Sequence, residues 1–123
     1  MILDERDDRF YAKASAIPGA GRGLFARIAL KAGERLEVIG VRVPRDSASD
    51  RYTGFADEYK FRVGDDLLIP CGIAALANHS SEPNLRKVVD GGAVFLELLR
   101  DVDPDEELCF GYSDYARRRY SLT

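Results

Sequence analysis

Eight residues, Ala77 to Asn84, read A-N-H-S-S-E-P-N and gather side chains that could do chemistry. They include two amides, the only histidine of the chain and two hydroxyls, groups that bind ligands by hydrogen bonds or serve in nucleophilic catalysis. A nucleophilic pair of Ser80 and His79 is disfavoured, because the two are sequence neighbours and no acidic residue is indicated that would orient the histidine. Taken alone, the segment predicts an ordered loop after a short buried helix at residues 73–77.

A second candidate segment is the glycine-rich stretch at residues 18–23, P-G-A-G-R-G, which is followed by L-F-A. Three glycines in five positions allow positive φ angles and a close approach of the backbone to another group. The ordinary alternative is a turn between two strands. A phosphate-binding loop is disfavoured, because neither G-x-G-x-x-G nor G-x-x-x-x-G-K-[ST] is present and no long helix follows.

A third candidate segment, D-E-E-L-C-F-G-Y at residues 105–112, lies near the end of the chain. Tyr112, taken alone, is most simply an aromatic residue that closes a barrel. The four acidic side chains between residues 103 and 107 could attract a basic partner, although a solvated turn is the simpler interpretation.

The elements that must position these segments are short strands separated by turns every eight to twelve residues, which predicts a mostly β domain. The absence of long amphipathic patterns argues against doubly wound α/β folds. Residues 45–57 are predicted to be an irregular surface insertion, and the tail from residue 113 one or two helical turns. The predicted strands are 11–17, 36–43, a hairpin of 59–63 and 67–69, a hairpin of 85–89 and 94–99, and 108–110.

Composition excludes several classes of protein. The 123 residues predict one domain, residues 11–123, after a charged lead-in at residues 1–10. With 18 basic and 21 acidic residues the net charge is −3, so direct binding to nucleic acid is not expected. No apolar run is long enough to span a membrane, and the acidic N-terminus does not resemble a signal peptide, so we expect a cytoplasmic protein. Two cysteines and one histidine, without a C-x-x-C pair, favour reduced thiols and no metal.

The three segments G-R-G-L-F-A, A-N-H-S-S-E-P-N and D-E-E-L-C-F-G-Y, in this order, resemble the motifs of the SET-domain protein lysine methyltransferases. The resemblance covers roughly residues 11–115. It implies a SET-domain (β-clip) fold of several small curved sheets with few short helices. It also implies a C-terminal pseudoknot that brings Tyr112 beside Asn78. The implied activity is transfer of a methyl group from S-adenosyl-L-methionine to a lysine amine of a protein, possible substrates being histone-like or ribosomal proteins.

The resemblance also implies roles for single residues. The cofactor would contact the backbone at Gly21, Arg22 and Gly23, the amide of Asn78 and the main chain of His79, a role that needs no titration of the imidazole. Tyr112 would be the catalytic tyrosine beside the transferring methyl. Three aromatic residues would line the channel for the substrate lysine. These channel residues are Phe110, Tyr115 and Tyr59, with Tyr120 a further candidate.

Departures from the family pattern keep an alternative open. Gly111 replaces the usual aspartate before the tyrosine, and no tyrosine precedes Gly40. Ser81 and Ala75 replace a usual cysteine and a common arginine. The alternative is a non-catalytic module on the same fold that binds a peptide or the cofactor, and an unrelated small β domain is the third option. The zinc-binding segments that flank many relatives are also missing, so residues 113–123 or a second subunit, in a homodimer, would have to cover the channel.

Overall fold

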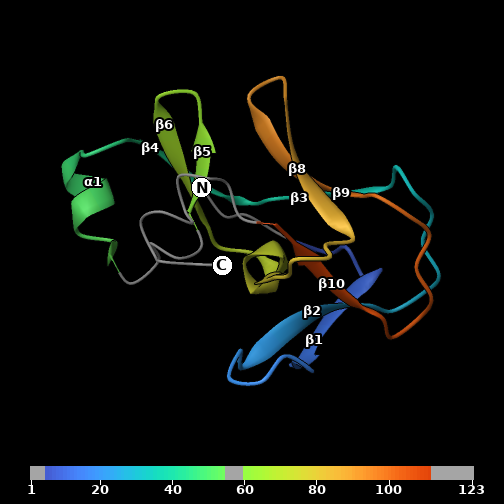
Figure 1. Cartoon of the computed structure of the whole chain (residues 1–123). Helices are drawn as coiled ribbons and strands as arrows, with labels where there is room; N and C mark the ends of the chain where they lie inside the picture. Colours follow the sequence, from blue (N-terminus) through green and yellow to red (C-terminus); the bar gives the residue numbers. More distant parts are fainter. Residues whose placement is uncertain (1–4, 55–59, 112–123) are drawn as a thin grey trace.

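The computed structural model describes residues 5–54 and 60–111, which form two β-sheets and short helical turns (Figure 1). The larger sheet has seven strands and the smaller has three. Among the described residues no helix has the length and apolar character needed to cross a membrane. In chain order the elements are β1 (Phe10–Ala14), β2 (Arg22–Ala26), β3 (Arg35–Glu37), β4 (Gly40–Pro44), α1 (Ala48–Arg51), β5 (Phe61–Val63), β6 (Asp66–Pro70), the 3₁₀ helix η2 (Ile73–Leu76), β7 (Asn78–His79), β8 (Leu85–Asp90), β9 (Ala93–Leu98) and β10 (Glu107–Phe110).

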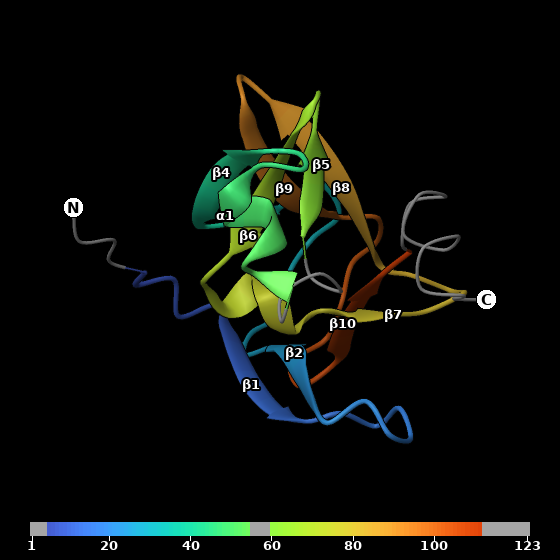
Figure 2. The ribbon, with the colours of Figure 1, turned by 90° about the vertical axis from the view of Figure 1, so that its left-hand side faces the viewer.

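The larger sheet places the last strand of the described chain in its interior. Its strand order is β1-β2-β10-β8-β9-β3, and β7 also pairs with β10. Strand β10 is antiparallel to β2 but parallel to β7 and β8. Parallel pairing cannot arise from a tight hairpin, so these contacts join segments that are distant in sequence. Figure 2 shows β10 beside β2 and β7.

The smaller sheet, of order β4-β6-β5, corrects one sequence prediction. The single strand predicted at 36–43 is in fact two strands, because β3 pairs with β9 and β4 pairs with β6. The chain changes sheets at Val38 and Ile39, whose backbone groups bond Val94 and Cys71 at 2.8 Å each. Gly40 then lies so close to β6 that an added Cβ would be 2.2 Å from the Ile69 carbonyl oxygen. A glycine is therefore required where the chain crosses between the sheets.

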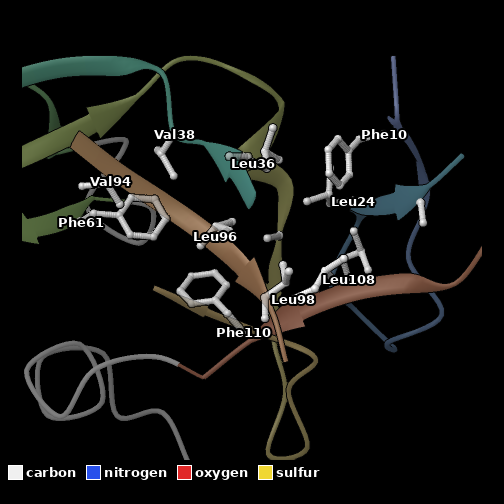
Figure 3. Packing of buried hydrophobic residues seen from close by; sticks show 14 of the residues in the cluster. Phe10, Leu24, Leu36, Val38, Phe61, Val94, Leu96, Leu98, Leu108 and Phe110 are labelled. Carbon is white, nitrogen blue, oxygen red and sulfur yellow. The ribbon is translucent and has the colours of Figure 1, made fainter. Parts of the chain in front are cut away.

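The predicted hairpins are confirmed, as β5–β6 and β8–β9, and the predicted short helix is η2. The two hairpins project on the same side of the molecule (Figure 1). Alternating exposure along β9 places every second side chain in the core. Figure 3 shows this core, in which strands of both sheets contribute side chains. Its largest fully buried side chains are Leu24, Leu30, Leu96, Leu108 and Val94.

The predicted insertion contains one helical turn that the sequence pattern did not reveal. Helix α1 begins after Ser47, whose hydroxyl oxygen accepts a hydrogen bond from the Asp50 N–H at 3.3 Å. Asp50 is buried, and its Oδ1 accepts a bond from Lys60 Nζ at 2.8 Å, both side chains being less than a tenth exposed. A buried charge is costly unless it is paired, so this ion pair fastens the insertion to the start of β5.

The charged segment before residue 11 packs against the sheet where it is described. Phe10 begins β1 and is buried. Arg9 donates to the Asp7 carboxylate and to the Arg35 carbonyl oxygen at 2.7 and 2.8 Å. Glu5 accepts a bond from the Ile73 N–H at 2.8 Å, at the start of η2. The lead-in thus reaches the turn that precedes β7.

Candidate cofactor and methyl-transfer site

The three candidate segments meet at one place, which we call the junction: residues 15–24, 78–79 and 107–110. Leu108 of β10 lies opposite Leu24 of β2. Cys109 and Phe110 then pair in parallel with Asn78 and His79 of β7. The fold therefore brings together motifs that are more than eighty residues apart in the chain.

Glu107 is the centre of the hydrogen bonds at the junction. Its carboxylate accepts bonds from the Ser15 hydroxyl at 2.7 Å, the Ala16 N–H at 3.0 Å and Asn78 Nδ2 at 3.3 Å. Hydrogen bonds to an ionised acceptor are stronger than those between neutral groups. Glu107 therefore ties the loop after β1 to β7, and it is not part of a merely solvated turn as the acidic run suggested.

Glycines shape the loop that enters the junction. Gly21 has φ of +73°, a conformation that side chains disfavour, and its carbonyl oxygen accepts a bond from the Ser15 N–H at 2.8 Å. At Gly23 the reason is space, because an added Cβ would lie 2.5 Å from a carboxylate oxygen of Glu107 and 3.3 Å from Asn78 Nδ2. The glycines of the motif thus allow the polar side chains of β7 and β10 to pack directly on the backbone.

The two polar atoms of the Asn78 side chain differ in their hydrogen bonding. Nδ2 donates to the Arg22 carbonyl oxygen at 3.1 Å as well as to Glu107. Within the described part of the chain Oδ1 accepts no hydrogen bond, and the residue is half-buried. The amide is therefore fixed in orientation while its oxygen is available to a ligand.

Asn84 clamps β10 from the other side. It is 4% exposed, its Oδ1 accepts from the Cys109 N–H at 2.8 Å and its Nδ2 donates to the Glu107 carbonyl oxygen at 2.9 Å. Its backbone N–H also donates to the Cys109 carbonyl oxygen at 3.1 Å. One buried side chain thus satisfies backbone groups of β10 where the strand passes β8.

The remaining side chains of β10 are apolar or neutral. Burial and the neighbouring Glu107 raise the pKa of the Cys109 thiol to about 11, so the thiol is protonated near neutral pH and is a poor nucleophile. Phe110 is buried, and its ring centroid lies 5.6 Å from that of Phe61 (Figure 3). The junction therefore combines a polar edge, at β2 and β7, with an apolar edge at Phe110.

Comparison with known proteins decides the family. The family model described as "SET domain" matches residues 21–113, about three quarters of the chain. This chain belongs to the SET-domain family. The matched range begins at Gly21, the second glycine of the loop, and includes the junction residues 21–24, 78–79 and 107–110.

Curated relatives of this SET domain are fungal enzymes. A histone-lysine N-methyltransferase of Emericella nidulans, H3 lysine-4 specific, is 33% identical in an alignment of 104 positions that covers 73% of this chain and 8% of the relative. An enzyme of the same description from Aspergillus oryzae is 31% identical with the same coverage. The chain thus spans less than a tenth of the length of these relatives.

Solved structures confirm the predicted SET-type fold. A candidate histone methyltransferase of Plasmodium falciparum matches with a TM-score of 0.66 and 19% identity, over 89% of this chain and 96% of that one. A humanised mutant of Chaetomium thermophilum Polycomb Repressive Complex 2 matches with a TM-score of 0.73 and 20% identity, over 89% of this chain and 16% of that one. A ctPRC2 structure bound to S-adenosylmethionine matches with the same score and identity, over 91% and 16%.

The structure of the SET domain brings together five of the residues predicted from the sequence for the cofactor site. Gly21, Arg22, Gly23, Asn78 and His79 all lie at the junction, where Arg22 is exposed and His79 pairs by its backbone with Phe110. Phe110, predicted for the channel wall, is next to them on β10. Four further predicted residues lie outside the described residues. These are the predicted catalytic residue Tyr112 and the predicted channel residues Tyr115, Tyr59 and Tyr120.

Sequence reasoning missed three residues that hold the junction together. Ser15 was assigned only to a strand, Glu107 to an acidic turn, and Asn84 was noticed as an amide without a role. The available signal for Asn84 was an amide that follows Pro83 and directly precedes the predicted strand 85–89. Glu107 gave no such signal, because its partners at residues 15, 16 and 78 become neighbours only in the fold.

Among the described residues no group of three His, Cys, Asp or Glu side chains is arranged to hold a metal ion. The one carboxylate at the junction, that of Glu107, accepts hydrogen bonds from hydroxyl, backbone and amide donors. The hydrogen bonds at the polar edge and the buried Phe110 at the apolar edge suit binding and positioning of a ligand and exclusion of water.

Proposed function

We propose that this SET-domain protein transfers a methyl group from S-adenosyl-L-methionine to the side-chain amine of a lysine in a protein substrate. The observation that carries the proposal is the junction, where the glycine loop, the N-H-S segment and the last strand meet through Asn78 and Glu107. Lysine methyl transfer is the activity named for the curated relatives.

The residues at the junction suit this cofactor. When bound, S-adenosyl-L-methionine supplies an activated methyl on a sulfonium and carries an ammonium and a carboxylate at its methionine end. The open Oδ1 of Asn78 and the backbone at Gly21 and Gly23 provide acceptors and close approach for such a polar cation. His79 would contribute its main chain, so the imidazole is not assigned a proton-transfer role.

The protein's part in the reaction is positioning. We assign Tyr112 to align the incoming amine through its hydroxyl, since orientation alone can lower a barrier by several kcal/mol. The amine must arrive neutral, although a free lysine has a pKa near 10.4. Phe110 at the apolar edge disfavours the charged form by removing water, and the neighbouring thiol is too weakly acidic to compete as a nucleophile.

The substrate is proposed to be a lysine in a basic, histone-like segment. Of the acidic run that could attract such a segment, Glu106 is paired with Arg100, and Asp105 accepts a bond from the Tyr11 hydroxyl at 2.5 Å. Specificity would therefore come from the channel rather than from this turn. We also propose a cytoplasmic location and a homodimer that completes the channel, and we assign Tyr59 and Tyr115 to the wall of the channel.

Calorimetric titration with S-adenosyl-L-methionine tests the cofactor site. Wild-type protein is expected to bind it, and Asn78→Ala at least tenfold more weakly, since a lost hydrogen bond to a charged group is worth about 1.5–3 kcal/mol. Ser81→Ala, an exposed change in the same loop, is the control and should leave the affinity unchanged. Equal affinity in wild type and Asn78→Ala would remove the cofactor from this place. No binding at all would favour the non-catalytic module.

A second substitution tests the role of Glu107. Glu107→Gln keeps the shape but points an amide donor at groups that are themselves donors, so we expect the loop after β1 to loosen and cofactor affinity to fall about tenfold. Glu106→Gln makes the same change next to it, in a surface pair with Arg100, and should change the affinity less than twofold. Equal effects of the two substitutions in the same titration would contradict the role of Glu107.

A further inference from the structure

Lys87 lies on the side of β10 that faces away from the predicted cofactor segments. Consecutive carbonyl groups of a strand point to opposite edges. The Phe110 carbonyl oxygen accepts from the Ser80 N–H, beside β7, whereas the Cys109 carbonyl oxygen accepts from the Asn84 N–H, beside β8. Strand β8 therefore runs along the edge of β10 opposite to β7, and Lys87 is on β8.

Register places Lys87 close to the end of β10. Leu85 is the parallel partner of Phe110, and Lys87 follows it by two residues, so both side chains leave the same face of β8. Lys87 Nζ donates to the Arg62 carbonyl oxygen at 2.9 Å. Arg62 directly follows Phe61, whose ring packs on Phe110. The amine is thus held at the backbone of β5, one residue after the Phe61 ring that packs on Phe110.

The amine of Lys87 differs chemically from those of the other lysines. Removal from water, and secondarily the nearby Arg62 charge, lower the pKa of Lys87, although the residue as a whole is exposed. A lower pKa gives a larger neutral, nucleophilic fraction at a given pH. Lys60 is held in the buried pair with Asp50, Lys13 lies 4.5 Å from the ring of Phe25, and Lys31 is exposed.

In-line displacement requires the amine to approach the methyl from the side opposite to the leaving sulfur. The donor is assigned to the β2 and β7 edge of β10, and Lys87 is on the other edge. We propose that Lys87 is itself a methyl acceptor of this protein, modified at Nζ with S-adenosyl-L-methionine as the donor.

This inference rests on the proposed function. The neutral amine forms the new N–C bond with its lone pair as the C–S bond breaks, S-adenosylhomocysteine leaves as a neutral thioether, and the proton released from nitrogen passes to water. The bond from Nζ to the Arg62 carbonyl must open for the reaction.

The test uses the whole chain with S-adenosyl-L-methionine that carries a deuterated methyl, followed by digestion with a protease that does not cut at lysine and mass spectrometry. The peptide that contains Lys87 is expected to hold at least tenfold more label than the peptide that contains Lys31. Lys87→Arg, which keeps a donor for the Arg62 carbonyl, should lose that label, and Lys31→Arg should keep it.

A basic lysine peptide, incubated in the same reaction, separates this inference from the proposed function. Label in the added peptide without label at Lys87 would overturn the inference and leave the function standing. Equal label at Lys31 and Lys87 would also overturn it, because any exposed lysine would then react. Label in neither the chain nor the added peptide would contradict both.

Discussion

Replacing Asn84 by alanine is expected to lower the free energy of unfolding by about 3 kcal/mol, because two backbone groups of β10 would lose their partner. The Cys109 N–H and the Glu107 carbonyl oxygen are bonded to the Asn84 side chain at 2.8 and 2.9 Å. The site is 4% exposed, so water cannot readily replace the amide. Equilibrium unfolding in urea, followed by circular dichroism, measures the change.

The same substitution at Asn78 is the matched control. Asn78 is half-buried and its partner groups are nearer to solvent, so Asn78→Ala should cost less than about 1 kcal/mol. The two variants therefore separate a residue that holds β10 in place from one that contacts a ligand. A loss below about 1 kcal/mol for Asn84→Ala would show that β10 does not depend on this clamp.

Tyr112→Phe is expected to slow methyl transfer about a hundredfold or more, equivalent to about 2.7 kcal/mol of the barrier. The change removes only the hydroxyl assigned to align the amine, so cofactor affinity should stay within twofold of wild type. Single-turnover measurements with a lysine peptide give the rate of the chemical step, and calorimetry gives the affinity.

Tyr11→Phe is the control for the loss of a tyrosine hydroxyl. Tyr11 lies on the edge strand β1 and its hydroxyl donates to Asp105, so removal of this hydroxyl should leave the rate unchanged. A rate for Tyr112→Phe equal to that of wild type would mean that the tyrosine assignment is wrong. A fall in cofactor affinity as large as the fall in rate would assign Tyr112 to binding instead of alignment.

Local patterns predicted the local elements well. The Asp90-Gly91-Gly92 turn specified the β8–β9 hairpin. Alternation specified β5, and the Gly64-Asp65-Asp66 turn before an apolar run specified β6. All these signals are contained in a few neighbouring residues. The division of the predicted strand 36–43 could not be read in this way. It depends on Gly40 lying against Ile69 of another strand, which the sequence near Gly40 does not encode.

The candidate site shows the same limit. The motifs carried the family resemblance, so Gly23 and Asn78 were predicted, and the structure places both at the junction. The role of Glu107 depends on partners that the parallel pairing of β10 with β7 brings together. The spacing of these residues along the chain does not predict that pairing. The family resemblance supplied the expectation that the last segment lies against the N-H-S segment, and the Cys109–Asn78 pairing confirms it.

The most direct test of the central claim is the mass of a basic lysine peptide after incubation with the purified protein and S-adenosyl-L-methionine. We expect wild-type protein to add methyl groups to a lysine of the peptide, with S-adenosylhomocysteine formed in equal amount, and Asn78→Ala and Tyr112→Phe to add far fewer. A peptide of unchanged mass, in the presence of protein shown by calorimetry to bind the cofactor, would contradict the claim and identify a binding module on a SET fold.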